Sequence, residues 1–336
     1  MVILLVIDYK EVSMNGIQNY ENNIERMINN KLEEYPNLTG YINYLSNKGA
    51  LTTNYNYLIH VIKFLNTTKK EFIDFDDYTS YLASLKNKTN GYQRCAYFAL
   101  KRYAEYLLYS GKANSNPMEK ISAPKNIESI KTKQKREKTF LTKEEVEETF
   151  VNIRYGIGSS QAKTIQEKWK ERDVAILLLF LSTGIRCSAL FKLDLNNINW
   201  NDSTLIVMDK GSKIHKYILP DKTIHALQLW IDKRNTLLEG RKEEALFISK
   251  NRTRLSQCAI SNLVKKYTAD IEGKHITPHK LRATFGTHLY NETRDIKFVQ
   301  DQMGHSNPKT TELYIRGNQD ADRKKASDIM SKFLDN

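Results

Sequence analysis

Cysteine is scarce in this sequence, and long apolar runs are absent from it. The three cysteines lie far apart, without the spacing of metal ligands or of a disulfide framework: Cys95, Cys187 and Cys258. We therefore expect a reducing, cytoplasmic location. The apolar run Val2–Ile7 is too short to cross a bilayer and lacks a basic leader, so we expect no membrane partner. This run is either a strand or a contact with a partner.

Acidic residues are outnumbered by basic ones. The sequence has 52 Lys and Arg against 39 Asp and Glu, which gives a net charge of +13. Such a surplus favours a polyanionic partner, because basic groups that approach phosphates release condensed counterions. A merely solvated basic surface is the alternative, and charge alone does not separate the two. Hydrophobic residues make up 40% of the chain, which indicates a folded globular protein rather than a disordered one.

Helical periodicity fills the stretch from about residue 38 to residue 108, with little sign of strands. Apolar residues recur at helical spacing from Tyr57 to Leu65 and again from Ala96 to Leu108. Gly111 and Asn116-Pro117 then break the pattern. We expect a helical unit over residues 38–123, after an N-terminal extension, residues 1–37, to which the sequence assigns no role.

Residues 124–139 are predicted to be a linker, because they show no apolar periodicity. The linker is basic and carries Lys131, Lys133, Lys135, Arg136 and Lys138. One interpretation is a solvated tether, and the other is a strap that lies along a DNA backbone.

A second unit is predicted over residues 140–317, with helices around a small antiparallel sheet. A capping-box pattern at Thr142–Glu145 starts its first helix, and the apolar run Val174–Leu181 indicates a buried central helix. Three β-like runs follow, at Ile198–Trp200, Leu205–Met208 and Tyr217–Leu219. Further helices are expected over residues 223–237, 257–267, 279–290 and 295–303. Residues 318–336 carry one apolar stripe and should form an amphipathic helix.

Five short motifs of the second unit attract attention together. They are Thr183-Gly184-Ile185-Arg186, Asp209-Lys210-Gly211-Ser212-Lys213, His279-Lys280-Leu281-Arg282, Gly304-His305, and Thr310-Thr311-Glu312-Leu313-Tyr314. Each motif alone has an ordinary explanation: a surface arginine, an exposed turn lysine, a solvated histidine or a core tyrosine. Their order and spacing make coincidence a poor explanation for the set.

The combination resembles the tyrosine recombinase family, also called the phage integrase family. The strongest local match is the segment from Thr277 to Phe285, and the pattern from Met303 to Tyr314 is nearly as specific. The resemblance covers residues 142–317. It extends more loosely to the helical first unit, whose Asn116-Pro117 exit resembles the end of that family's core-binding domain.

The resemblance implies a catalytic set made of Arg186, Lys210, His279, Arg282, His305 and Tyr314. Tyr314 would be the nucleophile that attacks a DNA phosphate. Arg186 and Arg282 would stabilise charge on the non-bridging oxygens, which planar guanidinium groups match well. His279 would act as the base, Lys210 as the acid for the leaving 5′ oxygen, and His305 as a hydrogen-bond donor. No metal or other cofactor is required, because the cations are built into the protein.

Two positions depart from the family's pattern. Ala189 stands where the family usually has an acidic residue, three positions after its first arginine. Ala283 stands where a histidine is common, directly after the second arginine. Neither change removes a reacting group, but both weaken the support of the arginines. We therefore expect activity that is slower or depends on partners.

The resemblance implies a site-specific recombinase that clamps double-stranded DNA between its two units in a prokaryotic cytoplasm. Four protomers would act on two sites through a 3′-phosphotyrosine intermediate, with residues 318–336 contacting a neighbouring protomer. The task would be integration, excision or resolution of a mobile element or replicon, and accessory DNA-bending proteins are further candidate partners. A DNA-binding protein without catalysis and a type IB topoisomerase stay open as alternatives. A metal-dependent nuclease is disfavoured, since no acidic cluster has two-metal spacing.

Overall fold

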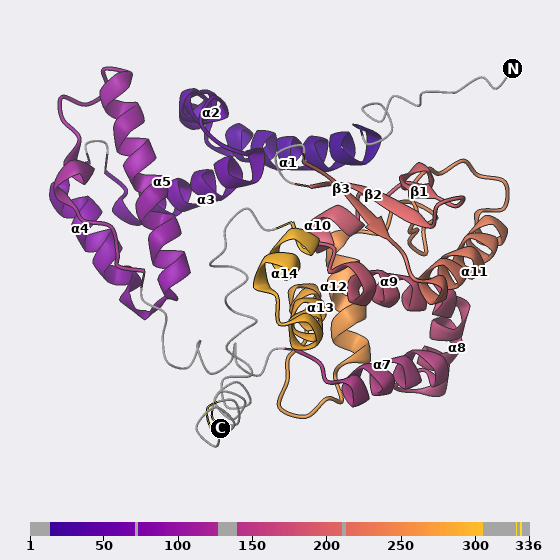
Figure 1. Cartoon of the computed structure of the whole chain (residues 1–336). Coiled ribbons are helices and arrows are strands. Elements are labelled where there is room, and N and C mark those ends of the chain that lie inside the picture. The colour runs from indigo at the N-terminus through magenta and orange to yellow at the C-terminus, as the bar shows by residue number, and fades with distance from the viewer. Residues whose placement is uncertain are drawn as a thin grey trace, which may run out of the picture. The chain divides into compact units, whose positions relative to one another are not determined.

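The computed structural model describes residues 14–70, 73–126, 140–209 and 213–304, with Ser327 and Met330; at 14–20, 22, 209 and 213 it describes the backbone alone. The chain divides into a helical unit within Ile17–Thr132 and a second unit within Lys133–Asn336 (Figure 1). The predicted fold class, mainly helical with a small antiparallel sheet, is confirmed. None of the helices in the described ranges is long and apolar enough to span a membrane.

The helical unit contains α1 (Met14–Glu34), α2 (Thr39–Ser46), α3 (Leu51–Thr68), α4 (Phe75–Ser84) and α5 (Asn90–Tyr109). Its core is rich in aromatic side chains. Tyr41 packs edge-on against Tyr103 with ring centroids 5.3 Å apart, and its hydroxyl donates to the Ala99 carbonyl over 3.0 Å. Because each buried hydroxyl of this kind needs a partner, the tyrosines fix how α2 and α5 pack.

Helix α1 lies inside the extension that the sequence analysis set apart as residues 1–37. Its Ile24 and Ile28 are 7% and 4% exposed and pack with Leu38 in the core of the helical unit. Helix α1 is rich in asparagines and glutamates and polar on average, yet its sequence places Ile24, Ile28 and Leu32 at helical spacing, so a signal for this helix was present. The helical unit therefore begins before residue 38.

The second unit is built around a buried helix. Its elements are α7 (Lys143–Tyr155), α8 (Ser160–Lys168), α9 (Lys170–Thr183), α10 (Cys187–Leu190), β1 (Ile198–Asn199), β2 (Thr204–Asp209), β3 (Lys213–Ile218), α11 (Asp221–Leu238), α12 (Gln257–Tyr267), α13 (Pro278–Thr293) and α14 (Ile296–Gln302). Residues 175–180 of α9 are all buried, and α9 packs against α7, α11 and α13. The predicted central helix is confirmed. So is the capping box, in which Thr142 accepts from the Glu145 backbone N–H and Glu145 from that of Thr142.

The three strands form one antiparallel sheet in the order β1-β2-β3, next to α10 (Figure 1). Strand β3 begins at Lys213, four residues before the predicted run at Tyr217. Because Lys213, His215 and Lys216 are polar, the first part of this strand shows no hydrophobic pattern. Its pairing with β2 nevertheless continues to the Asp209↔Lys213 position. Helix α8 was not predicted, since it contains only two apolar residues, Ala162 and Ile165, and these do not establish a periodicity.

Two predictions fall on parts of the chain that the structure does not describe. The cationic linker residues Lys131, Lys133, Lys135, Arg136 and Lys138 lie outside the described residues. In the predicted C-terminal helix, only Ser327 and Met330 are described, and both are helical. The roles of the linker and the tail stay predictions.

Candidate active site

Three of the six predicted catalytic residues, Arg186, His279 and Arg282, lie in the described part of the chain. The other three, Lys210, His305 and Tyr314, lie outside it. Strands β2 and β3 on either side of Lys210 are described, however, and so is Met303, two residues before His305, which accepts a hydrogen bond from Arg282.

Arg186 follows the turn that ends α9 at Gly184. Helix α9 ends in Gly184, whose φ of +61° is in the left-handed region. A Cβ on Gly184 would stand 2.5 Å from a ring carbon of Phe285, so α13 packs directly on this backbone. The Thr183 hydroxyl donates to the Leu179 carbonyl over 2.6 Å and accepts from the Ile185 N–H over 3.1 Å. Arg186, the N-cap of α10, is therefore presented by a rigid turn.

Arg282 joins three elements of the site. It is only 2% exposed, and it projects from α13. Its Nη1 donates to the carbonyl of Gly184, and its Nη2 donates to the carbonyl of Met303, the C-cap of α14. A buried guanidinium needs such acceptors, because an unpaired buried charge is strongly unfavourable. The side chain thus ties the turn before Arg186 to the turn before His305.

His279 stands in the first turn of α13, directly after Thr277 as N-cap and Pro278. It is exposed, and it precedes Arg282 by three residues, which places both on one face of the helix. An exposed imidazole beside a buried guanidinium suits an exchange of protons with a group that approaches from solvent.

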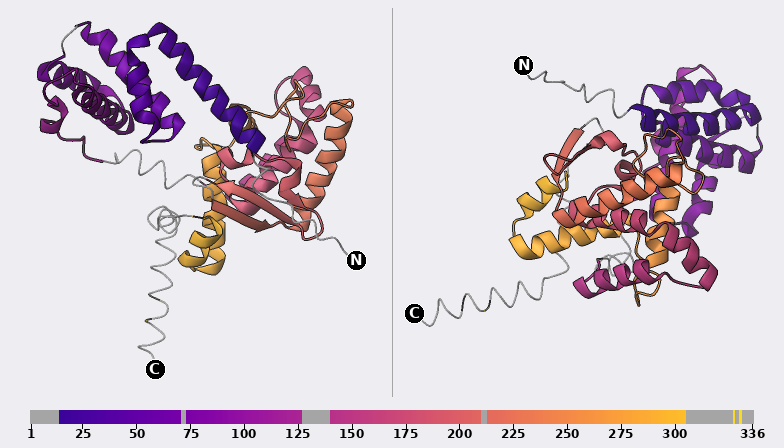
Figure 2. Two further views of the ribbon diagram at one scale, coloured as in Figure 1. Left: turned by 90° about the horizontal axis from the view of Figure 1, so that it is seen from above. Right: turned by 90° about the vertical axis from the view of Figure 1, so that its right-hand side faces the viewer.

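The β2–β3 hairpin brings further side chains to this site. On β3, His215 and Tyr217 pair with Val207 and Leu205 of β2. A Cβ on Gly304, which has a φ of +59°, would collide with the His215 ring, so that ring lies against the backbone next to His305. The phenol of Tyr217 lies within interaction range of the Arg282 guanidinium. Figure 2 shows the sheet beside α14 in both of its views. The sequence pattern predicts a strand at Tyr217 and indicates no role for its side chain.

Burial and charge oppose each other at Tyr217. Burial raises the pKa of the phenol, and the charges of Arg282 and Arg186 together with the Arg282 hydrogen bond lower it, with burial the larger effect. Tyr217 is therefore neutral at physiological pH. Burial also raises the pKa of Cys187, next to Arg186, to about 11. That thiol stays protonated and does not compete as a nucleophile.

The two alanines that depart from the family's pattern occupy apolar surroundings. Ala189 is 5% exposed on α10. Ala283, on α13, packs against the cluster of Val299 and Met303 that seats α14. These positions support the turns around the arginines by packing, with no side-chain hydrogen bond to offer.

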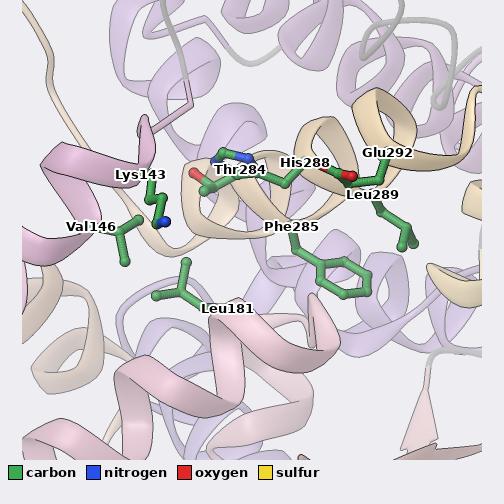
Figure 3. A pocket seen from close by; sticks show the side chains of 8 residues that line it. All are labelled: Lys143, Val146, Leu181, Thr284, Phe285, His288, Leu289 and Glu292. Carbon is green, nitrogen blue, oxygen red and sulfur yellow. The ribbon is translucent and has the colours of Figure 1, made fainter.

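An apolar cavity of about 430 Å³ lies between α7, α9 and α13 (Figure 3). Its lining residues are Lys143, Val146, Leu181, Thr284, Phe285, His288, Leu289 and Glu292. Leu181 and Phe285 face each other across it, and Phe285 is the ring that packs on Gly184. Within the described ranges, no group of three or more His, Cys, Asp or Glu side chains is arranged to hold a metal ion.

Comparisons with known proteins agree with this geometry. The model of the phage integrase family matches residues 139–320. Tyrosine recombinase XerS of Streptococcus thermophilus is 30% identical over 304 residues, which cover 84% of either chain. Tyrosine recombinase XerC of Alcanivorax borkumensis is 30% identical over 216 residues, and the match spans 64% of this chain and 65% of XerC, just under two thirds. The crystal structure of XerH bound to palindromic difH substrate, a post-cleavage complex, superposes with a TM-score of 0.63 at 22% identity, over 83% of this chain and 80% of XerH. That likeness shows the fold.

Proposed function

This chain belongs to the phage integrase family of tyrosine recombinases, and we propose that it cuts and rejoins DNA at specific sites through a covalent bond between Tyr314 and a 3′-phosphate. One observation carries the proposal. Arg282 donates hydrogen bonds to the backbone carbonyls of Gly184 and Met303. It therefore links the turn before Arg186 to the turn before His305. A guanidinium held in this way is organised for a phosphate before DNA binds.

The proposed reaction has two balanced steps. In cleavage, His279 takes the proton of Tyr314, the phenolate bonds to phosphorus, and the bond to the 5′ oxygen breaks while Lys210 supplies a proton. In rejoining, a 5′ hydroxyl from another strand attacks the phosphotyrosine and gives its proton to Lys210. The bond between Tyr314 and phosphorus breaks, and Tyr314 regains its proton from His279. Arg186 and Arg282 stabilise the non-bridging oxygens in both steps. Removing one such donor typically costs about 10²–10³ in rate.

The proposed partner is double-stranded DNA, and its recognition draws on the net charge of +13. Four protomers act on two sites, and the amphipathic segment 318–336 contacts a neighbouring protomer. Integration, excision or resolution of a mobile element or replicon is the proposed task. XerH, which shares the fold, was crystallised with its DNA substrate, and this supports a DNA partner.

The experiment is to denature the protein after incubation with genomic DNA fragments and to sequence the DNA that stays attached. A recombinase should carry one recurrent sequence, joined to Tyr314 through the 3′ end of the cut strand. Attachment to many unrelated sequences would favour the topoisomerase alternative. No attached DNA, with normal binding before denaturation, would favour the DNA-binding protein without catalysis.

A further inference from the structure

The inward face of β3 differs from that of its neighbour. On β2 the inward residues are the aliphatic Leu205 and Val207, which are 0% and 2% exposed. Opposite them β3 carries Tyr217 and His215, both partly buried, while Ile214 and Ile218 point outward and are 58% and 80% exposed. Strand β3 thus places its polar aromatic side chains inward and its isoleucines outward. A solvent-directed strand would do the reverse.

The two aromatic residues are arranged as a pair. The rings of His215 and Tyr217 stack with centroids 6.3 Å apart and planes inclined by 28°. His215 lies against Gly304, and Tyr217 lies within interaction range of Arg282 and within the charge field of Arg186. The pair therefore spans the distance from the turn of α14 to both arginines.

Two neighbouring guanidinium groups repel each other, so holding them near one phosphate position requires oxygen acceptors around them. Carbonyl oxygens of Gly184 and Met303 serve Arg282. Ala189 and Ala283, where the family commonly has an acid and a histidine, offer no such side-chain atom. A neutral phenol at Tyr217 supplies oxygen lone pairs to Arg282 and keeps its own O–H as a donor.

We propose that Tyr217 is a positioning residue: its hydroxyl oxygen orients Arg282 and sets it against Arg186, so that both guanidinium groups face one phosphate. The inference rests on the proposed function, since it concerns the same site. When the hydroxyl is removed, Arg282 keeps its two carbonyl partners, and so the fold survives. The guanidinium then loses the phenol oxygen that lies within its interaction range.

The test compares single-turnover cleavage of a nicked suicide substrate by the wild type and by Tyr217→Phe. The variant keeps the ring and its stacking on His215, and it removes only the hydroxyl. Because Tyr217→Phe loses an interaction with a charged group, its cleavage rate should fall roughly 10- to 100-fold. DNA affinity and melting temperature should stay close to those of the wild type.

Tyr267→Phe is the matched control. It also removes a hydroxyl from the second unit, one that donates over 2.8 Å to the buried carboxylate of Asp173, which also pairs with Arg172. That variant should melt at a lower temperature and cleave at the wild-type rate. A merely structural role for Tyr217 would reproduce the behaviour of the control.

A double-variant cycle tests whether Tyr217 acts through Arg282. In an Arg282→Lys background, which lacks the planar guanidinium, Tyr217→Phe should cause little further loss of cleavage rate. Wild-type cleavage by Tyr217→Phe, or a full further loss in the Arg282→Lys background, would overturn the inference. Both outcomes presuppose a wild type that forms the covalent adduct. Failure of the wild type itself would count against the proposed function instead.

Discussion

Gly184 and Arg282 determine how the turn after α9 is held. Gly184 allows both the left-handed backbone and the close approach of Phe285. Arg282 donates a hydrogen bond to the Gly184 carbonyl. Both residues stand within the motifs that the sequence presents. The two backbone carbonyls to which Arg282 donates could not be predicted, because acceptors of this kind leave no trace in residue types.

Gly184→Ala should therefore damage both stability and cleavage. The left-handed backbone costs an alanine about 1–2 kcal/mol, and collision with the Phe285 ring adds to it. The Arg186 turn must move, so single-turnover cleavage should fall as well. Gly273→Ala is the control: its φ is +69°, but open space surrounds the new Cβ. The control should lose stability alone, measured by urea unfolding, and equal losses in both variants would contradict the role given to Phe285.

A second residue-scale prediction concerns Lys210, which lies outside the described residues. As the general acid, it should become dispensable when the leaving atom needs no proton. Lys210→Ala should therefore be slow on an ordinary phosphodiester and close to the wild type on a substrate with sulfur at the 5′ bridging position. Arg282→Ala should be slow on both substrates. If Lys210→Ala is equally impaired on both, the lysine holds the phosphate, and His279 becomes the next candidate acid.

At the scale of elements, clear apolar patterns led to correct predictions and polar ones did not. The run Val174–Leu181 and the pattern Gln257–Tyr267 predicted α9 and α12, because each helix buries one continuous apolar surface. Helix α8 and the first half of β3 present polar residues, so their signal was too weak. The role proposed for Tyr217 arises from its proximity to Arg282, 65 positions away in sequence, which no local pattern can report.

The linker offers an element-scale prediction. Replacing Lys131, Lys133 and Lys135 with Ala should weaken binding to all DNA sequences alike, since phosphate contacts carry no base information. The slope of log affinity against log salt should become shallower by about 0.9 for each phosphate that the variant no longer neutralises. Affinity is measured by fluorescence anisotropy across a salt series, with an unrelated duplex beside the recognition site. An unchanged slope would mean that the linker is only a tether.

At the scale of the whole molecule, the chain combines a helical unit with a unit that holds the arginines. The family match over residues 139–320 covers the second unit and the position of Tyr314. The excess of basic residues adds a general attraction to DNA. Chemistry at one tyrosine is the claim on which the rest of the proposed function depends.

The most direct measurement of that claim is covalent capture on a nicked suicide substrate, resolved on a denaturing gel. The substrate carries the site recovered by sequencing attached DNA, and it releases a short fragment after cleavage, so the adduct cannot reverse. The wild type should give a protein–DNA band, and Tyr314→Phe should bind the same DNA with unchanged affinity and give none. A covalent band that survives in Tyr314→Phe would mean that another residue is the nucleophile, and the proposed role of Tyr314 would be contradicted.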